Sequence, residues 1–392
     1  MPEYTISLTP PVPQAYSEEI EKRIFFISSE IIDFKLKTGD DHIRHIEVAT
    51  RNKVNEEELA EKVNFVIKND VLTQKVFAPK VIWRSGAKRQ YGEDIFNRLL
   101  EQGIAFEAGE GQVSFGEPLI SLMDIFDGKI KDLVKSLFNA AEYRYPTIIP
   151  TKVVDGCGYF SSFPHMLMMV TRFHSDLDIY KEFAAEYKEK GIDASLIKFC
   201  KNTDYCLPPT MCYHTYHQLS GKEIDNRVIT ARGKSFRYES KYHQSLERLW
   251  DFTIREIVFL GTKDFVLDCR RRLMDATFAL LEDLKLEVYC EVANDPFFCR
   301  PDTAVKIFSQ RMMELKYELR MNTSAASTIS VGSFNYHEQF FAENFTLKSP
   351  GEDELIFTGC AGFGLERLVY AFLCQYGLDR EHWPETIRKA LN

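Results

Sequence analysis

The chain alternates between two hydrophobic patterns along its whole length. Short runs rich in β-branched and aromatic residues, bounded by turn formers, are typical of strands. Longer stretches with apolar residues three and four positions apart are typical of amphipathic helices. The runs that predict strands are 23–27, 31–37, 43–48, 289–301, 329–337 and one starting at 357. The stretches that predict helices are 55–67, 93–102, 130–141, 178–191, 264–286, 302–319 and 364–373. This mixture predicts an α+β fold.

Residues 236–261 hold the largest group of side chains with recognisable chemistry. The hydrophobic pattern predicts a strand, a polar loop and a returning strand. Alternation along a strand puts Arg237 and Glu239 on one face of the first strand, and Arg248 and Phe252 on one face of the second. A guanidinium, a carboxylate and an aromatic plane suit a nucleotide's phosphate, adenine edge and adenine face. A plain hairpin with a charged outer face is the alternative interpretation.

Two domains are predicted. Residues 1–108 form a small α+β accessory domain, residues 107–112 a plausible linker, and residues 109–392 the larger domain. The helix predicted over 130–141 runs into an extended segment that ends in Pro146 and Pro150. Because proline cannot donate a hydrogen bond within a sheet, this segment is predicted to be an edge or interface strand.

Composition narrows the function classes. The 392 residues are 45% hydrophobic and 27% charged, with a net charge of −9 and no basic tail, which disfavours a large nucleic-acid footprint. No apolar stretch reaches the roughly 18 residues of a membrane helix. The first residues lack an export signal, so a cytoplasmic location is expected. Nine cysteines without a Cys-x-x-Cys pair are predicted to be reduced thiols, most of them buried.

A second group of residues lies near the end of the chain. Gly362 and Gly364 precede a predicted helix whose first turn carries Arg367. Glycines allow close approach of a ligand to the backbone, although Gly-x-Gly alone usually reflects tight packing. Together with Arg-x-Glu, a loop and Arg-x-x-x-Phe in 236–261, this segment resembles motifs 2 and 3 of class II aminoacyl-tRNA synthetases. The helix and strand before Pro146 resemble motif 1, the dimer element, so the resemblance covers about residues 110–380.

The resemblance implies an antiparallel sheet flanked by helices, a homodimer, and ATP with Mg²⁺ as cofactors. It implies that Arg237 contacts the α-phosphate and Glu239 the adenine amino group. Phe252 would stack on the adenine, and Arg367 with Arg248 would hold the outer phosphates. We call these five residues the nucleotide group, with Arg237 and Arg367 as its catalytic members. Two further residues, Asn335 and His337, are candidates for contacting the substrate.

The same resemblance implies a zinc site. Two thiols and a carboxylate, Cys212, Glu256 and Cys360, occupy positions similar to the zinc ligands of atypical seryl-tRNA synthetases and of amino acid:carrier protein ligases. We call these three residues the metal group. Three protein ligands leave one coordination position open, which would hold the amino group of the amino acid. Three unrelated buried residues are the alternative.

Several strings look most like the carrier protein ligases. They include Cys-Gly-Tyr-Phe-Ser-Ser-Phe-Pro-His from 157, Cys-Tyr-His-Thr-Tyr-His from 212, and Ala-Asn-Asp-Pro-Phe-Phe from 293, besides the strings from 236, 248 and 362. This likeness implies ATP-dependent activation of a small amino acid, glycine or alanine, and its transfer to the phosphopantetheine thiol of a carrier protein. The extra residues 1–108 keep a zinc-dependent seryl-tRNA synthetase, with tRNA as acceptor, as one alternative. An inactive nucleotide- or carrier-binding paralogue is the other.

Two features are left open by the resemblance. The seryl enzymes' Glu-x-Ser-Ser-x-Ser-Asn pattern is replaced here by a Ser-Thr-Ile-Ser-Val-Gly-Ser-Phe-Asn run that ends at Asn335, so the Mg²⁺ ligand is not assigned. The segment 166–191, a methionine cluster followed by the charged helix predicted over 178–191, is either ordinary packing or a surface for the carrier protein.

Overall fold

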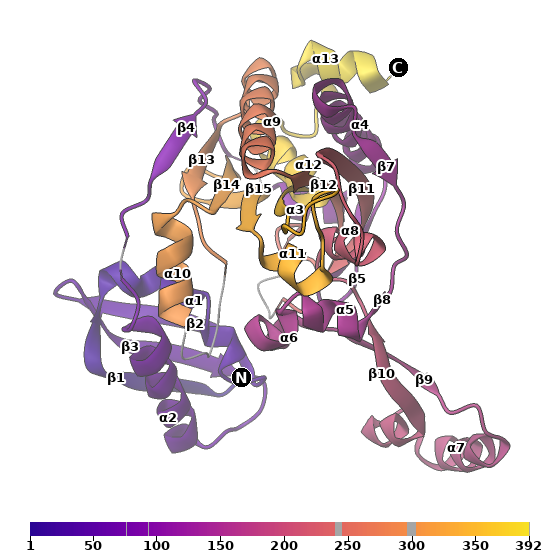
Figure 1. The fold of residues 1–392 in the computed structure, drawn as a ribbon. Coiled ribbons are helices and arrows are strands. Elements are labelled where there is room, and N and C mark those ends of the chain that lie inside the picture. Colours follow the sequence, from indigo (N-terminus) through magenta and orange to yellow (C-terminus); the bar gives the residue numbers. More distant parts are fainter. Residues whose placement is uncertain (76, 93, 240–244, 296–302, 392) are drawn as a thin grey trace.

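An eight-stranded sheet forms the centre of the molecule in the computed structural model, which describes residues 1–75, 77–92, 94–239, 245–295 and 303–391 (Figure 1). The strand order is β4-β13-β14-β15-β16-β12-β11-β7, antiparallel except for β7, which runs parallel to β11. The strands are β4 (Val81–Arg84), β7 (Ala141–Tyr143), β11 (Arg227–Phe236), β12 (Asp251–Gly261), β13 (Val288–Val292), β14 (Lys316–Asn322), β15 (Thr328–Glu338) and β16 (Phe357–Gly364). The predicted α+β fold with a largely antiparallel sheet is confirmed.

Helices cover both faces of this sheet. One layer packs in the larger core and consists of α3 (Ile95–Glu101), α4 (Leu119–Phe138), α9 (Lys263–Asp283) and α12 (Leu365–Tyr376). The other layer consists of α5 (Thr151–Gly156), α6 (Tyr159–Ser162), α8 (Cys212–Leu219) and α11 (Phe340–Phe345). Successive side chains of β12 enter opposite cores, because Ile257 packs with the first layer and Val258 with the second. Glu256 therefore faces the second layer, where the candidate site lies.

The N-terminal residues form a small module with its own core. Its sheet has the order β1-β3-β2, made of β1 (Glu3–Pro13), β2 (Ile31–Gly39) and β3 (His42–Thr50). The helix α2 (Glu56–Val66) begins after Asn55, whose side chain accepts the N–H groups of Glu57 and Glu58, and it continues into η3 (Ile67–Val71). This core runs from Ile6 to Val71, whereas β4 already pairs with β13 of the large sheet. The domain boundary at residue 108 stays a proposal.

Two predictions in the first 115 residues are wrong. The strand predicted over 23–27 is the 3-10 turn η2 (Ile24–Phe26), which follows η1 (Gln14–Tyr16) and α1 (Ser17–Glu21). The third strand of this sheet is instead β1. Its three prolines are unusual in a strand, so its sequence does not predict one. The linker predicted over 107–112 belongs to a hairpin of β5 (Ala105–Gly109) and β6 (Gln112–Phe115).

The β5–β6 hairpin packs against Trp250, which lies between Arg248 and Phe252 in the sequence. Its turn contains Gly111 at φ +67°, where a Cβ would lie 2.4 Å from the Trp250 ring. The backbone N–H of Trp250 also donates to the Gly111 carbonyl at 2.8 Å. Glycine is therefore needed for both the turn and the close approach.

Other segments differ from prediction in extent. The predicted helix 302–319 is α10 (Thr303–Met312) followed by β14, and Glu314 adopts a left-handed conformation between them. The predicted strand 289–301 is β13 up to Val292, and residues 296–301 lie outside the described residues, as do residues 240–244 of the polar loop. The predicted helix 264–286 is confirmed as α9, and that over 130–141 belongs to α4, which begins eleven residues earlier, at Leu119.

A long arm projects from the body beside the second helical layer (Figure 1). It consists of β9 (Met169–Phe173), α7 (Leu177–Lys190), η5 (Ala194–Phe199) and β10 (Cys200–Cys206), and its sheet is completed by β8 (Ile149–Pro150). The turn η4 (Pro164–Met166) precedes the arm, and η6 (Arg380–His382), α13 (Glu385–Arg388) and η7 (Lys389–Leu391) end the chain. The helix predicted over 178–191 is confirmed as α7. None of the helices in the described ranges is long and apolar enough to cross a membrane.

Candidate active site and metal centre

The nucleotide group lies where β11 ends and β12 begins. Register along this pair puts Phe236 opposite Asp251. Arg237 and Glu239 therefore lie just beyond β11, not within a strand as predicted, and Arg248 lies just before β12. The Glu239 carboxylate accepts a hydrogen bond from Arg248 Nη1 at 3.3 Å and lies 3.9 Å from Arg367 Nη2. One buried carboxylate thus joins two arginines from distant parts of the sequence.

Phe252 lies beneath two arginines of this group. The guanidinium carbon of Arg237 lies 5.4 Å from the centre of the Phe252 ring, and that of Arg367 lies 6.0 Å from it. Arg237 Nε donates to the Pro209 carbonyl at 3.1 Å, which fixes the side chain. Arg367 stands on the first turn of α12, directly after Gly364. All five residues of the nucleotide group are therefore brought together.

The electrostatics of this group favour a charged carboxylate between guanidinium groups. Burial of Glu239 opposes its ionisation, but the charges of Arg248, Arg367 and Arg237 prevail, so its pKa is below the ordinary value. Burial and the nearby charge of Arg248 lower the pKa of Arg367 to about 10. Both groups remain charged at neutral pH. The guanidinium groups already carry their positive charge, so the cluster can bind an anion such as phosphate without a change of protonation.

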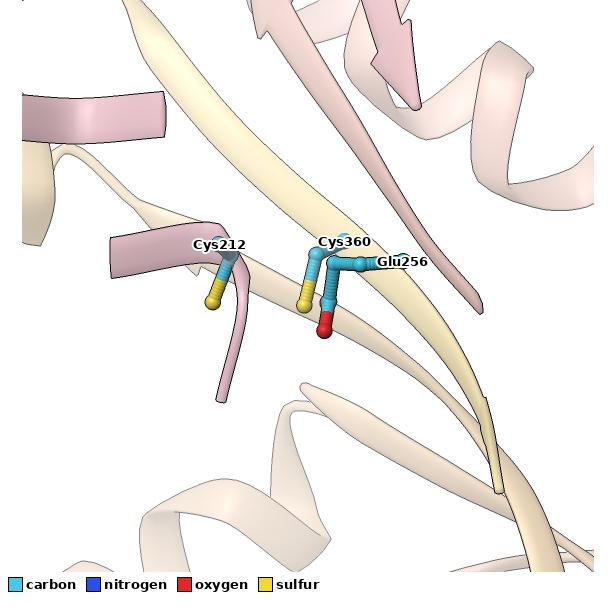
Figure 2. A group of neighbouring side chains, drawn as sticks. All are labelled: Cys212, Glu256 and Cys360. Carbon is cyan, nitrogen blue, oxygen red and sulfur yellow. The ribbon is translucent and has the colours of Figure 1, made fainter. Parts of the chain in front are cut away.

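The metal group lies on the second-layer face of the sheet. Glu256 is on β12 and Cys360 on the neighbouring β16, while Cys212 is the first residue of α8. The two sulfur atoms and one carboxylate oxygen lie within 4.8 Å of one another, and all three residues are buried. Figure 2 shows the ends of the three side chains pointing to the same side. Thiolate and carboxylate are both ligands that zinc accepts, so the donor set fits this metal.

The surroundings of the metal group disfavour negative charge. Burial raises the pKa of Glu256 to about 7. The adjacent Cys212 thiol, burial and the Glu256 carboxylate raise the pKa of Cys360 well above its ordinary value. Within the described part of the chain, no lysine or arginine forms an ion pair with Glu256. A cation at this position would supply the missing positive charge.

Asn335 and His337 contact the same thiol from β15. Asn335 lies opposite Cys360 in the register of β15 and β16, and its Nδ2 donates to Cys360 Sγ at 3.5 Å. His337 Nε2 lies 3.6 Å from the same sulfur, and its Nδ1 lies 3.3 Å from the Tyr216 hydroxyl. Burial lowers the pKa of His337 to about 4, so the ring is neutral at neutral pH. The two residues predicted to contact substrate thus lie beside the metal group.

Known proteins resemble this chain in sequence and in architecture. No family model matches the chain. A type-2 serine–tRNA ligase of Methanococcus aeolicus is 30% identical over 297 residues, which are 72% of this chain and 56% of that ligase. An amino acid–acyl-carrier-protein ligase of Bradyrhizobium diazoefficiens is 30% identical over 261 residues, which are 63% of this chain and 75% of that ligase. The chain belongs to the family of amino acid–acyl-carrier-protein ligases and is related to the type-2 serine–tRNA ligases.

Solved structures agree with this membership at the level of the fold. The M. kandleri seryl-tRNA synthetase, crystallised with A. aeolicus tRNASec, has a TM-score of 0.72 at 24% identity and covers 92% of this chain and 73% of its own. A Giardia lamblia prolyl-tRNA synthetase with prolyl-adenylate has a TM-score of 0.52 at 14% identity, covering 71% of this chain and 52% of its own. The class II synthetase-like fold is therefore shown. The match to the serine–tRNA ligases spans just over half of their length.

Three polar residues near the candidate site are not predicted from the sequence. Thr210 Oγ1 donates to Glu256 Oε2 at 3.0 Å. Asp295 accepts from Lys316 Nζ at 2.7 Å, and Lys316 lies opposite Asn335 in the β14–β15 register. Asp295 lies in the string from 293 and Thr210 lies two residues before Cys212, so both are close in sequence to predicted features without being predicted themselves. Lys316 was missed because it was predicted to be helical.

Proposed function

We propose that this protein activates a small amino acid with ATP and transfers it to the phosphopantetheine thiol of a carrier protein. The main support is the placement of the two groups on β12. Phe252 of the nucleotide group and Glu256 of the metal group are four residues apart, and residues four apart face the same side of a strand. Their separation is about 13 Å along the strand. That length leaves room for ribose, α-phosphate and amino acid between the adenine and the metal.

The chain's own residues would act by positioning and charge. The amino acid carboxylate attacks the α-phosphorus, the bond to pyrophosphate breaks, and an aminoacyl-adenylate forms. Arg237 would hold the α-phosphate, with Arg367 and Arg248 beside the outer phosphates, so the developing charge meets fixed guanidinium groups. The step needs no general base because the nucleophile is already a carboxylate.

Two bound ions would assist this chemistry. Cys212, Glu256 and Cys360 would hold zinc, which supplies an open Lewis-acid position for the amino group of the amino acid. Mg²⁺ supplies charge neutralisation for the triphosphate. Asn335 and His337, both touching the Cys360 sulfur, would orient this ligand and line the amino acid pocket.

In the second step the phosphopantetheine thiol attacks the activated carbonyl carbon, and AMP leaves as a thioester forms. The Bradyrhizobium diazoefficiens relative, an amino acid–acyl-carrier-protein ligase, supports this acceptor. The type-2 serine–tRNA ligases support tRNA as the alternative acceptor, with serine as the amino acid.

The proposed function is tested in two stages with the zinc-loaded full chain. Pyrophosphate exchange is first measured with each of the twenty amino acids, and glycine or alanine should support the fastest exchange. The labelled amino acid is then offered to a phosphopantetheinylated carrier protein and to total tRNA. Charging of tRNA alone would establish the alternative. Exchange with none of the amino acids would contradict the activity and leave an inactive nucleotide- or carrier-binding paralogue.

The arm is the proposed docking surface for the carrier protein. Exposed apolar side chains gather on it, and α7 has no buried residue. Leu177 is 66% exposed, Ile192 84% and Ile197 66%. An apolar surface of this kind on a soluble body is typical of a partner contact. The arm leaves the body next to α5 and α6, and α7 lies at its far end (Figure 1).

Changing Leu177 and Tyr180 together to serine tests this surface. We expect transfer to the carrier protein to slow about tenfold while pyrophosphate exchange is unchanged, because both side chains are exposed and far from the chemistry. The control is Phe65→Ser, which removes a comparably exposed ring from α2 of the N-terminal module and should leave both steps intact. Equal loss of both steps in the arm variant would contradict the docking proposal.

We also propose that two copies associate through β7. This strand is the outermost of the large sheet, and Tyr143 and Ile148 near it are exposed. An open groove of about 720 Å³ lies beside it and is lined by Glu142, Arg144, Arg232 and Arg255, among others. An unpaired edge strand with exposed apolar groups is a common dimer contact. Sedimentation equilibrium should give twice the mass of the chain, and a monomer at micromolar concentration would contradict the proposal.

A further inference from the structure

Tyr159 is held in a fixed position on the site face of the sheet. It is the first residue of α6 and only 6% exposed. Its ring packs edge-on against Tyr213, with centroids 6.2 Å apart, and lies 5.1 Å from the ring of Phe163. Tyr213 directly follows Cys212, and Tyr159 belongs to the same hydrophobic cluster as Cys212 and Cys360. The ring therefore has ordinary packing contacts, which leaves the role of its hydroxyl to be explained.

The Tyr159 hydroxyl is buried and has no hydrogen-bond partner among the residues that the structure describes. Buried hydroxyl groups normally have a partner, because the group loses its bonds to water on folding. Phenylalanine would pack in the same way without this cost. On the face of the sheet that carries the candidate site, such a hydroxyl is in a position to donate to a bound ligand.

Charged groups of the nucleotide group and its surroundings act on this hydroxyl. Burial is the largest effect on Tyr159 and raises its pKa, with smaller effects from Arg237, Glu239 and Asp295. The segment that follows α6 contacts the nucleotide group, because the Tyr238 N–H, between Arg237 and Glu239 in the chain, donates to the Met166 carbonyl at 3.0 Å. Tyr159 therefore belongs to the part of the chain that packs beside Arg237, and because burial raises its pKa, the hydroxyl keeps its proton at neutral pH and can donate.

We propose that Tyr159 is a catalytic residue whose hydroxyl donates a hydrogen bond to a non-bridging oxygen of the α-phosphate while the adenylate forms. This inference rests on the proposed adenylation activity. The carboxylate oxygen bonds to phosphorus, the bond to the pyrophosphate oxygen breaks, and the electron pair leaves with pyrophosphate. The tyrosine keeps its proton throughout. The hydroxyl and Arg237 would together face the charge that develops on the transferred group.

The test is Tyr159→Phe in the zinc-loaded full chain, compared with Tyr336→Phe. Tyr336 is the matched control because its buried hydroxyl also lacks a partner in the described part of the chain, but its ring packs in the first-layer core on the opposite face. Both variants should keep or raise the wild-type melting temperature, since each loses an unsatisfied hydroxyl.

Only the Tyr159 variant should lose activity. Its kcat in pyrophosphate exchange is expected to fall at least about tenfold, with KM for ATP and the amino acid changed less than about twofold, as for loss of a donor used in the transition state. Binding of the adenylate analogue 5′-O-(glycylsulfamoyl)adenosine should weaken in Tyr159→Phe only.

Three results would overturn the inference. They are wild-type kcat and analogue affinity in Tyr159→Phe, a fall in melting temperature parallel to the fall in activity, or an equal loss in Tyr336→Phe. The wild-type protein measured in the same assay separates this inference from the proposed function. No exchange by wild-type protein would overturn both, whereas an active wild type with an equally active Tyr159→Phe would overturn only the role of Tyr159.

Discussion

The β11–β12 pair buries charge in two different ways, at its loop end (the nucleotide end) and around Glu256, opposite Ala231 (the metal end). At the loop end, the carboxylate of Glu239 lies between the guanidinium groups of Arg248 and Arg367. In the middle of β12, Glu256 accepts from neutral donors, among them the Thr210 hydroxyl, and has two thiols as neighbours. The pKa of Glu239 is lowered, whereas burial raises the pKa of Glu256 to about 7. Two buried glutamates of one hairpin thus have different surroundings: arginines surround Glu239, and neutral groups surround Glu256.

The difference shows which end depends on a ligand for its own stability. An ion pair with several arginines compensates the desolvation of Glu239 within the protein. The metal group has no such compensation in the described residues, so a bound cation would stabilise the fold there as well as take part in chemistry. We expect the nucleotide end to be formed before ATP binds. The metal end is expected to reach its full stability only with metal bound.

The largest expected effect comes from removing a metal ligand. Cys360→Ala should lose about one equivalent of bound zinc per chain and reduce pyrophosphate exchange by more than about 100-fold, because even loss of an outer partner of a ligand costs about 10–100-fold. Zinc is measured by mass spectrometry on the purified protein. The control is Cys374→Ser, a half-buried cysteine on α12 outside the metal group, which should keep both metal and activity. Metal-free wild-type protein with full activity would end the zinc proposal.

A somewhat smaller effect is expected at the nucleotide end. Arg237→Lys keeps the positive charge but loses the planar fork and the Nε–H that binds the Pro209 carbonyl. We expect kcat for exchange to fall about 100-fold, as for loss of one transition-state donor. Zinc content should be unchanged, because the two ends are separately stabilised. Loss of zinc in this variant would show that the comparison between the two ends is wrong.

The smallest effect concerns stability and its dependence on pH. Glu239→Gln removes the charge between Arg248 and Arg367 and should lower the free energy of unfolding by about 1–3 kcal/mol at pH 7. In the folded protein the pKa of Glu239 is lowered from the value near 4.5 that an unfolded chain would show. Its stabilisation is therefore present above pH 4.5 and lost as the pH falls through the folded pKa.

The difference between wild type and Glu239→Gln should accordingly shrink as the pH is lowered from 6 towards 3. It is measured by urea unfolding at each pH. The control is Glu61→Gln on the exposed side of α2, which should show little difference from wild type at any pH. A difference for Glu239→Gln that stays constant down to pH 3 would contradict the ion-pair explanation.

Much of the candidate site could be predicted because its residues lie in short local patterns. The Arg-x-Glu segment, the Arg-x-x-x-Phe segment and the Gly-x-Gly segment before Arg367 are each readable without a structure. Their proximity was inferred from a family resemblance, and the contacts of Glu239 with Arg248 and Arg367 agree with that inference. The roles of these residues stay proposals until the variants are measured.

Other parts of the site depend on register and long-range packing, which local patterns do not carry. Lys316 was predicted to be helical, because the apolar spacing continues from α10 past the left-handed turn at Glu314. In the sheet it lies opposite Asn335. The N-terminal module was predicted as separate, yet Phe26 packs against the cluster that contains Cys212 and Cys360. The contact of Phe26 joins segments more than a hundred residues apart.

The amino-acid order is sufficient to predict the α+β class, most of the helices and strands, and a short set of residues able to bind nucleotide and metal, because periodicity and residue chemistry are local properties. The fold itself determines which glutamate meets arginines and which meets thiols. Glu239 and Glu256 are the same residue type seventeen positions apart. The pairing of β12 with β16 brings Cys360 beside Glu256, whereas α12 brings Arg367 beside Glu239. Their opposite pKa shifts follow from those neighbours and from burial, which arise only when distant segments pack together.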